Sequence, residues 1–296
     1  MDTSTPAVAS RALRKDWTNI LFLAAAHLAA LGGVLWLAFV RFSPWTIGLA
    51  VLWFLLCGLG ITGGYHRLFA HKSYKAAPLV RAFYLAFGAA AVQNSALKWS
   101  SDHRVHHAFT DTDQDPYNIR RGFLWAHLGW ILFKDQGVEH ANVRDLSDDP
   151  LVRFQDRHYI LLAVLFGALL PMALGALWGD AIGALLVAGF LRLVVQWHAT
   201  FCVNSLAHTI GSQPYSAKGT ARDSFVTAIV TLGEGYHNFH HTFQADYRNG
   251  VRWYQLDPTK WIVWSLSKVG LTTDLRRTPD KAMVMALRDT AGRGAA

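Results

Sequence analysis

Four long runs of apolar residues limit the folds open to this chain more than any other feature of its sequence. The runs cover residues 19–40, 45–65, 159–178 and 181–203, and only the fourth contains a charged residue, Arg192. A helix needs about 20 predominantly apolar residues to cross the roughly 30 Å hydrocarbon core of a bilayer. Uncharged runs of this length are uncommon in soluble folds, so four buried helices of a soluble protein are the weaker interpretation. The sequence therefore predicts an all-α integral membrane protein with four transmembrane helices.

The positions of lysine and arginine predict how these helices are oriented. Three basic residues precede the first run, twelve lie between residues 66 and 158, and eleven follow the fourth run. The two short loops on the other side carry only Arg41. Short segments rich in lysine and arginine stay on the cytoplasmic side of a membrane. We therefore expect both termini, and the long segment between the second and third helices, to be cytoplasmic.

The chain divides into a membrane part and a cytoplasmic cap. We expect a single domain over residues 17–270, whose cap consists of residues 66–158 and 209–270, with tails at residues 1–16 and 271–296. The net charge of +8 suits a lipid bilayer with anionic headgroups. No nucleic-acid-binding motif is present, which argues against a nucleic acid partner. Because the sequence shows no endoplasmic-reticulum retention signal and no fused haem domain, we expect a bacterial inner membrane.

Two histidine clusters with the same spacing lie in the predicted cap. The stretches DHRVHH and GEGYHNFHH contain six histidines: His103, His106, His107, His237, His240 and His241. In a helix, positions i, i+3 and i+4 share a face, so each cluster aims three imidazoles at one place. Two clusters with identical spacing argue against histidines that merely decorate a solvated surface.

Two shorter elements add three more histidines at the cytoplasmic membrane boundary. HRLFAH carries His66 and His71 just after the second run, and NSLAH carries Asn204 and His208 at the end of the fourth. One tetrahedral zinc ion takes four ligands, so nine imidazoles suit two metal ions that share them. Imidazole binds zinc, copper, iron and nickel alike, and the ligand type therefore does not identify the metal. The predicted ligands are His66, His71, His103, His106, His107, His208, His237, His240 and His241.

Carboxylates beside these clusters are candidates to support the metal ligands. Histidines that bind a metal usually donate their second N–H to a carboxylate or a carbonyl. The candidates are Asp102, Asp111, Asp113 and Glu234, and the alternative for each is an ordinary solvated carboxylate. Five further histidines have no partners at ligand spacing, and we expect ordinary packing or surface roles for His27, His127, His140, His158 and His198.

With these motifs in place, the chain resembles a membrane fatty acyl desaturase of the stearoyl-CoA (Δ9) type. The resemblance rests on HRLFAH, DHRVHH, NSLAH and GEGYHNFHH, extends to DPYNIRRGFLWAHLGW and QLDPTKW, and covers about residues 17–270. It implies a di-iron centre held by the nine histidines, with Asn204 reaching one iron through water, and O2 as a co-substrate. It also implies four transmembrane helices beneath a cytoplasmic cap, and an acyl-CoA whose CoA moiety lies near Asn19 and Lys134. Because no fused cytochrome b5 domain is seen, we expect a separate electron donor such as cytochrome b5, ferredoxin or a reductase.

The chemistry of a saturated chain favours a metal-based oxidant. A mid-chain methylene has no acidic proton and no leaving group, whereas iron with O2 supplies a strong one-electron oxidant. We therefore predict loss of hydrogen from adjacent methylenes of a long-chain acyl-CoA, or of another acyl carrier, in a bent apolar tunnel that Trp99 helps to line. A di-iron hydroxylase or alkane monooxygenase is an alternative that only the resemblance disfavours. A non-enzymatic metal transporter is a second alternative, although transporters place ionisable residues near the bilayer midplane rather than at helix ends.

Overall fold

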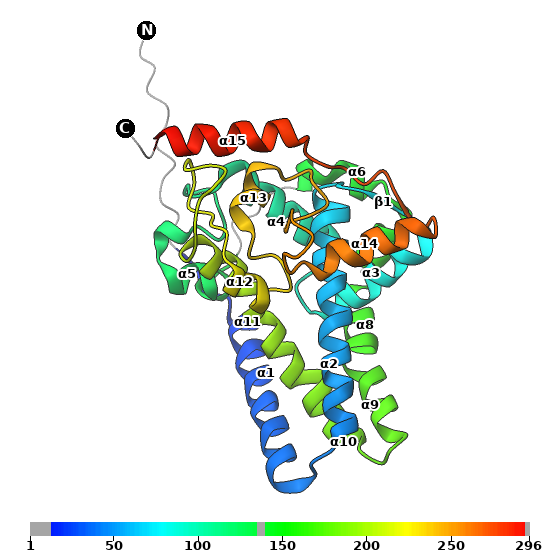
Figure 1. The fold of residues 1–296 in the computed structure, drawn as a ribbon. Coiled ribbons are helices and arrows are strands. Elements are labelled where there is room, and N and C mark those ends of the chain that lie inside the picture. The colour runs from blue at the N-terminus through cyan, green and yellow to red at the C-terminus, as the bar shows by residue number, and fades with distance from the viewer. Residues whose placement is uncertain (1–12, 135–139, 294–296) are drawn as a thin grey trace.

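The computed structural model describes residues 13–134 and 140–293, which form a bundle of long helices and a cap above it (Figure 1). Four helices are long and apolar enough to cross a bilayer: Trp17–Val40, Pro44–Ala70, Tyr159–Ala176 and Ala181–His208. Large apolar side chains on the bundle point outward, among them Leu28, Phe39 and Leu177, which are 70%, 81% and 79% exposed. Such a surface is stable in lipid and not in water. The predicted all-α membrane fold is therefore confirmed.

Each span combines α-helical turns with wider π-helical turns. The first is α1 (Trp17–Leu35) with a π-helical end at Trp36–Val40, and the second is α2 (Pro44–Leu59) with a π-helical continuation at Gly60–Ala70. The third contains α8 (Tyr159–Val164), a π-helical turn at Leu165–Leu169 and α9 (Leu170–Ala176). The fourth contains α10 (Ala181–Ala184), a π-helical turn at Leu185–Leu191, α11 (Arg192–Asn204) and a 3₁₀ turn at Leu206–His208.

The second span continues to Ala70, five residues past the end predicted from hydropathy. All eleven residues of Gly60–Ala70 are buried, including Arg67, which is only 1% exposed. The segment packs closely against α3 (Pro78–Ala90), since a Cβ added at Gly64 would lie 2.5 Å from the Tyr84 Cβ. The helix thus carries polar residues out of the membrane and into the cap, where other protein groups form hydrogen bonds with them.

The cap consists of short helices around the upper ends of the spans. In chain order they are α3, α4 (Ala96–Phe109), α5 (Phe123–His127), α6 (Arg144–Ser147), α7 (Pro150–Arg157), α12 (Phe225–Val230), α13 (His237–Thr242), α14 (Pro258–Lys268) and α15 (Asp280–Arg293). Additional 3₁₀ turns lie at Ile119–Arg121, Gly129–Leu132 and His140–Val143. Helix α15 lies across the top of the cap, whereas α3, α5, α12 and α14 lie closer to the bundle (Figure 1).

The apolar stretch 82–97 is too short to cross a bilayer, and its sequence favours an interfacial or re-entrant helix. In the structure it holds the end of α3 and the start of α4. The side chain of Ser95 accepts a hydrogen bond from the Lys98 N–H and so begins α4. The new helix changes the chain direction directly before the first histidine cluster.

Chain segments outside residues 17–270 also pack onto the cap. Strand β1 (Lys75–Ala76) pairs antiparallel with β2 (Thr272–Thr273), with Lys75 opposite Thr273. The described part of the predicted C-terminal tail therefore includes β2 and α15. At the other end, Lys15 pairs with Phe133 across an isolated β-bridge.

Three histidines, one each from α1, α5 and α11, form a chain of contacts that joins these helices. His27 Nε2 lies 3.2 Å from His198 Nε2, and His198 Nδ1 lies 3.0 Å from His127 Nε2. His127 Nδ1 in turn lies 2.9 Å from Ser205 Oγ. Their separation in sequence gave no sign of this contact, because it depends on how the three helices pack.

Candidate metal centre

Nine histidines meet in two groups where the cap joins the bundle. The first group contains five, His66, His71, His103, His107 and His240, and the second contains four, His106, His208, His237 and His241. Within each group, one nitrogen from every member lies within 4.8 Å of those of the other members. These are the nine histidines that the sequence motifs single out. Although they are spread from His66 to His241 along the chain, they come together in two adjacent groups.

Each histidine cluster contributes to both groups, because its members point in two directions from one helix. Helix α4 sends His103 and His107 to the five-histidine group and His106 to the four-histidine group. Helix α13 sends His240 to the first group and His237 and His241 to the second. The i, i+4 pair of each helix therefore stays together, and the intervening residue reaches the neighbouring group.

The π-helical end of the second span explains how His66 and His71 face one place. On an ideal α-helix, residues five apart diverge, but a π-helical turn closes with a bond between residues i and i+5. The His71 N–H donates such a bond to the His66 carbonyl oxygen at 3.1 Å. The two imidazole centroids consequently lie 4.9 Å apart.

Six of the nine imidazoles have a pKa below its usual range, which favours the neutral form that metal ligands require. Burial lowers the pKa of His103, His107 and His240 well below its usual range, and neighbouring imidazoles lower it further. The same two causes lower the pKa of His71, His237 and His241. At pH 7 these side chains therefore keep a free lone pair.

The nitrogen positions fit metal ions better than they fit hydrogen bonds alone. His240 Nε2 lies 3.0 Å from both His66 Nε2 and His107 Nε2, and His241 Nε2 lies 3.0 Å from His237 Nε2. The buried His208 Nε2 has no hydrogen-bond partner among the residues that the structure describes. An unsatisfied buried nitrogen is destabilising, and a metal ion at the centre of each group would satisfy these lone pairs together. All-imidazole groups suit first-row transition metals such as iron.

Three side chains behind the groups orient the imidazoles. Glu234 Oε2 lies 2.9 Å from His66 Nδ1, and Asp115 Oδ1 lies 2.8 Å from His106 Nδ1. Thr220 Oγ1 lies 2.7 Å from His208 Nδ1. In each of these histidines the hydrogen bond at Nδ1 leaves Nε2 free to face the group. A hydrogen bond at one ring nitrogen thus fixes which tautomer the imidazole adopts and how it is oriented.

The carboxylates that the sequence suggested for this role have different positions. Glu234 contacts His66 directly, whereas Asp111 acts through Thr220, whose hydroxyl donates to Asp111 Oδ1 at 2.6 Å. Asp102 forms an ion pair with Lys98 at 2.5 Å. Asp115 was missed, although its position nine residues after His106 in the DTDQDPYN loop was the available signal. Burial raises the pKa of Glu234, but Arg67 and His66 outweigh it and lower the pKa to about 2.

Replacing Asp115 by asparagine is expected to weaken metal binding by about 10- to 100-fold, which is typical when such a supporting carboxylate is lost. Asp115 is 2% exposed and also accepts the Tyr117 N–H, so the change removes the charge and leaves most of the packing. The metal content of the purified protein at limiting iron measures the effect. Asp289→Asn on the exposed side of α15 serves as the control, and equal metal content in both variants would contradict the role of Asp115.

A cavity of about 1140 Å³ leads to the histidines from one side. It is slightly larger than the roughly 300–1,000 Å³ that is typical of small-molecule sites. Its wall includes His66, His103, His106 and His237, together with Asn204. The three predicted substrate-contact residues, Asn19, Lys134 and Trp99, line it as well. Trp99 stacks on His103 with ring centroids 4.8 Å apart, which ties the cavity wall to the five-histidine group.

Several known proteins are similar to this chain over most of its length. A "Probable acyl-CoA desaturase" of Schizosaccharomyces pombe is 46% identical over 268 residues, which is 90% of this chain and 55% of that protein. "Acyl-CoA desaturase 1" of Saccharomyces cerevisiae is 48% identical over 241 residues, which is 80% of this chain and 47% of that protein. The chain thus spans about half the length of these two relatives. The "Delta(9)-fatty-acid desaturase fat-7" of Caenorhabditis elegans is 40% identical over 273 residues, 90% of this chain and 80% of that protein.

The family comparison covers the second, third and fourth spans and both histidine clusters. The family described as "Fatty acid desaturase" matches residues 43–273. The relatives named above are eukaryotic and give no support to the bacterial membrane that the sequence analysis expected. The spans, the paired histidine groups and these matches agree: the chain is a multi-pass membrane protein that belongs to the fatty acid desaturase family.

Proposed function

We propose that the chain is an O2-dependent desaturase that inserts a cis double bond at the Δ9 position of a saturated fatty acyl-CoA. Support for the acyl-CoA comes from the names of the two yeast relatives, and support for Δ9 comes from the nematode relative. The observation that carries the proposal is the opening of both histidine groups onto one long cavity within the membrane bundle.

Two iron ions, held by the nine histidines with Asn204 acting through water, would supply the oxidising power that unactivated methylenes require. In the overall reaction the acyl chain loses two hydrogen atoms, and O2 becomes two waters with two electrons and two protons from outside. The protein's own task is to orient the histidines, exclude bulk water and align the chain. Glu234, Asp115 and Thr220 perform the first task through their contacts with His66, His106 and His208.

The remaining cavity residues suit an acyl chain with a polar carrier. Apolar side chains such as Phe54 and Ile61 line the part within the bundle, and Asn19 and Lys134 line the part near the cap. The Asn19 amide donates to the Ile131 carbonyl oxygen at 3.1 Å, which holds the start of α1 against the cap. We assign the CoA moiety to this end and the methyl end of the chain to the membrane interior.

The cap side is assigned to the cytoplasm. Of the basic residues, only Arg41 lies in the loops at the far end of the bundle. This distribution is typical of a cytoplasmic cap. Electrons would then come from a cytoplasmic donor.

Product analysis tests the proposed reaction. The purified protein, loaded with iron, would be given stearoyl-CoA, O2 and a chemical reductant, and the acyl product would be analysed by mass spectrometry. Loss of two hydrogens with a double bond at carbon 9 is the expected result. Gain of one oxygen would instead identify a hydroxylase, and an unchanged acyl chain would contradict both reactions.

Substitution of Gly58 is expected to shift the preferred acyl chain to a shorter length. Gly58 lines the cavity on α2, and a Cβ added there would lie 2.7 Å from Leu232 Cδ1. Gly58→Val therefore adds side-chain volume at the cavity wall against Leu232, which also lines the cavity, and so reduces the room for the methyl end. We expect kcat/KM for stearoyl-CoA relative to myristoyl-CoA to fall about 10-fold or more, since each methylene without space costs about 1–3 kcal/mol. Gly48→Val is the matched control, because the position is exposed and a Cβ there meets nothing within 4 Å.

A further inference from the structure

His208 is the only one of the nine predicted ligands that lies in the fourth span, and it belongs to the four-histidine group. Its side chain is buried, and its Nδ1 lies 2.7 Å from Thr220 Oγ1. The other ring nitrogen, Nε2, can bind a metal ion only when the ring proton is on Nδ1. The groups that hold this proton on Nδ1 therefore decide whether His208 can act as a ligand.

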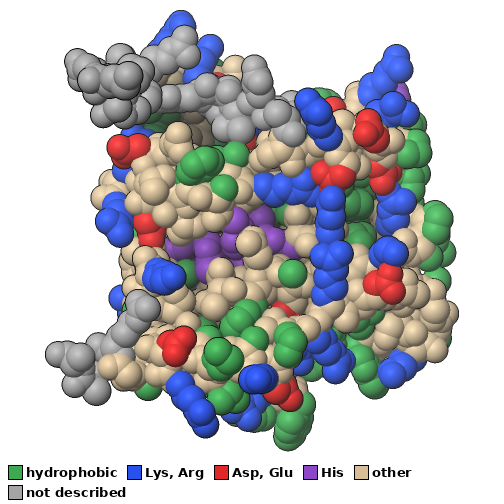
Figure 2. Space-filling model, turned by 90° about the horizontal axis from the view of Figure 1, so that it is seen from above, with side chains coloured by type: hydrophobic (Ala, Val, Ile, Leu, Met, Phe, Trp, Pro, Cys, Tyr) green, Lys and Arg blue, Asp and Glu red, His purple; other side chains and the backbone are tan. Residues whose placement is uncertain are grey.

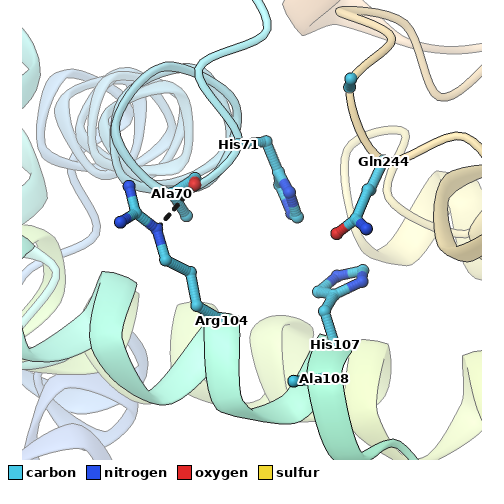
Figure 3. Close-up of a pocket in the computed structure, with 7 residues that line it drawn as sticks. Ala70, His71, Arg104, His107, Ala108 and Gln244 are labelled. Atoms are coloured by element: carbon cyan, nitrogen blue, oxygen red, sulfur yellow. Dashed lines mark hydrogen bonds between the residues drawn. The ribbon is translucent and has the colours of Figure 1, made fainter. Parts of the chain in front are cut away.

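The five-histidine group is less closed to solvent. A cleft of about 390 Å³ opens onto it from the face of the cap, with His71 and His107 in its wall. Both side chains are half-buried, and the close-up shows them facing the open space from two sides (Figure 3). Seen from above the cap, histidine side chains lie at the bottom of a hollow (Figure 2). Solvent can therefore reach these two rings, whereas protein groups must orient the buried ring of His208.

Asp111 fixes the direction in which the Thr220 hydroxyl donates its hydrogen. Thr220 Oγ1 lies 2.6 Å from Asp111 Oδ1, and the Thr220 N–H donates to Asp111 Oδ2 at 2.8 Å. A carboxylate only accepts hydrogen bonds, and a hydroxyl has one hydrogen to donate. Because that hydrogen goes to Asp111, Thr220 Oγ1 accepts from His208 Nδ1. The ring proton is thereby held on Nδ1, and the lone pair of Nε2 stays free for a metal ion.

The loop that carries Asp111 also serves a second ligand of the four-histidine group. Asp111 has a φ of +65°, in the left-handed region that aspartate tolerates better than most residues. In this conformation its N–H donates to Asp115 Oδ2 at 3.1 Å, and Asp115 Oδ1 lies 2.8 Å from His106 Nδ1. One loop thus orients two ligands of the same group, one directly and one through a hydroxyl.

We infer that Asp111 is a positioning residue that sets the tautomer of His208 through the Thr220 hydroxyl, and so controls the metal affinity of the four-histidine group alone. The inference rests on the proposed function, because it takes His208 to be a metal ligand. It deepens that proposal by making the two metal sites separable: a change at Asp111 acts on one of them and leaves the other intact.

The variant Asp111→Asn tests the inference because an amide has one accepting oxygen and a donating NH2 group. The Thr220 N–H can only donate, so it takes the oxygen, and the NH2 group then faces the Thr220 hydroxyl. The hydroxyl must now donate to His208 Nδ1, which moves the ring proton to Nε2, much as an amide in place of a carboxylate imposes the wrong histidine tautomer elsewhere. We expect the iron affinity of the four-histidine group to fall about 10- to 100-fold. The affinity of the five-histidine group should not change.

Two measurements read out this effect without relying on activity. Iron titration, with anomalous diffraction at limiting iron to assign each site, gives the occupancy of the two groups separately. In the metal-free protein, nitrogen NMR of samples with labelled histidine reports the tautomer of His208, whose signal a His208→Gln variant identifies. The unchanged protein should carry the proton on Nδ1, and the Asp111→Asn protein should carry it on Nε2.

Three further variants separate positioning from a general effect on the loop. Thr220→Ser keeps the hydroxyl and should bind iron like the unchanged protein, whereas Thr220→Val removes it and should weaken the four-histidine group. In the Thr220→Val background, Asp111→Asn should cause no further loss, because the two residues act as one unit. A carboxylate that only stabilised the loop would weaken binding equally in both backgrounds. Asp148→Asn, at an exposed position after α6, is the matched control and should bind iron normally.

The outcomes distinguish the inference from the proposal beneath it. An unchanged His208 tautomer in the Asp111→Asn protein, or an equal loss of iron from both groups, would overturn the inference. A protein that shows the expected tautomers but binds no iron in its unchanged form would instead count against the proposed function.

Discussion

Replacing His240 by alanine is expected to abolish desaturation and to lower the affinity for iron by about 100-fold or more. Loss of a supporting side chain alone typically costs 10- to 100-fold, and a direct ligand matters more. His240 is 2% exposed, and its Nε2 lies 3.0 Å from both His66 Nε2 and His107 Nε2. Its removal therefore opens the centre of the five-histidine group. Iron content and the yield of unsaturated acyl product, measured on the same sample, check both effects.

His27→Ala is the matched control for the His240 variant. His27 is half-buried in α1 and, like His240, contacts another histidine, but it belongs to neither of the two groups. We expect this variant to keep its iron and its product, with at most a modest change in thermal stability. A His240→Ala protein that retained two irons and normal product would contradict the assignment of the five-histidine group.

Replacing Arg67 by methionine is expected to destabilise the fold by about 3–5 kcal/mol, because it leaves buried carboxylates without their cation. Arg67 is 1% exposed and lies 2.8 Å from Glu234 Oε1 and 2.9 Å from Asp257 Oδ1. Its guanidinium also donates to the Tyr247 carbonyl oxygen at 2.9 Å. At roughly 2–4 °C per kcal/mol, the midpoint of thermal unfolding in detergent should fall by about 10 °C. Iron content should fall too, since Glu234 orients His66.

Two controls test whether the stability lost in the Arg67 variant comes from its buried ion pairs. Arg67→Met/Glu234→Gln removes one uncompensated charge and should recover part of the lost stability, whereas two independent effects would add. Arg81→Met breaks the pair with Asp149, in which both side chains are more than 20% exposed, and should cost only about 0–1 kcal/mol. Equal losses from Arg67→Met and Arg81→Met would show that burial of the network is not what stabilises it.

The membrane spans were predictable because each is a long apolar stretch, and only the fourth contains a charged residue, Arg192. The nine histidines were predictable from four short motifs, but helical spacing did not show that each three-histidine cluster divides between two groups. The end of the second span was not predictable, since His66 and Arg67 look like helix-ending residues until α3 and α14 bury them. Asp115 was hidden for a related reason. Only the return of the chain after α4 brings its carboxylate to His106, and no periodicity records that return.

Contacts between distant segments account for the rest. Thr220 reaches His208 from a loop, and the His27, His198 and His127 contacts depend on the packing of α1, α11 and α5. The cleft over His71 and His107 likewise forms only when residues 70–71, 104–108 and 244–245 come together. Sequence patterns within one helix say nothing about such neighbours, which tertiary packing alone determines.

The claim on which the account depends is that each histidine group holds one iron ion. Anomalous diffraction from crystals of the iron-loaded protein, collected on both sides of the iron absorption edge, tests it most directly. The account predicts two iron peaks per chain, one among His66, His71, His103, His107 and His240 and one among His106, His208, His237 and His241. A single peak, or peaks outside these groups in protein that still forms the double bond, would contradict it.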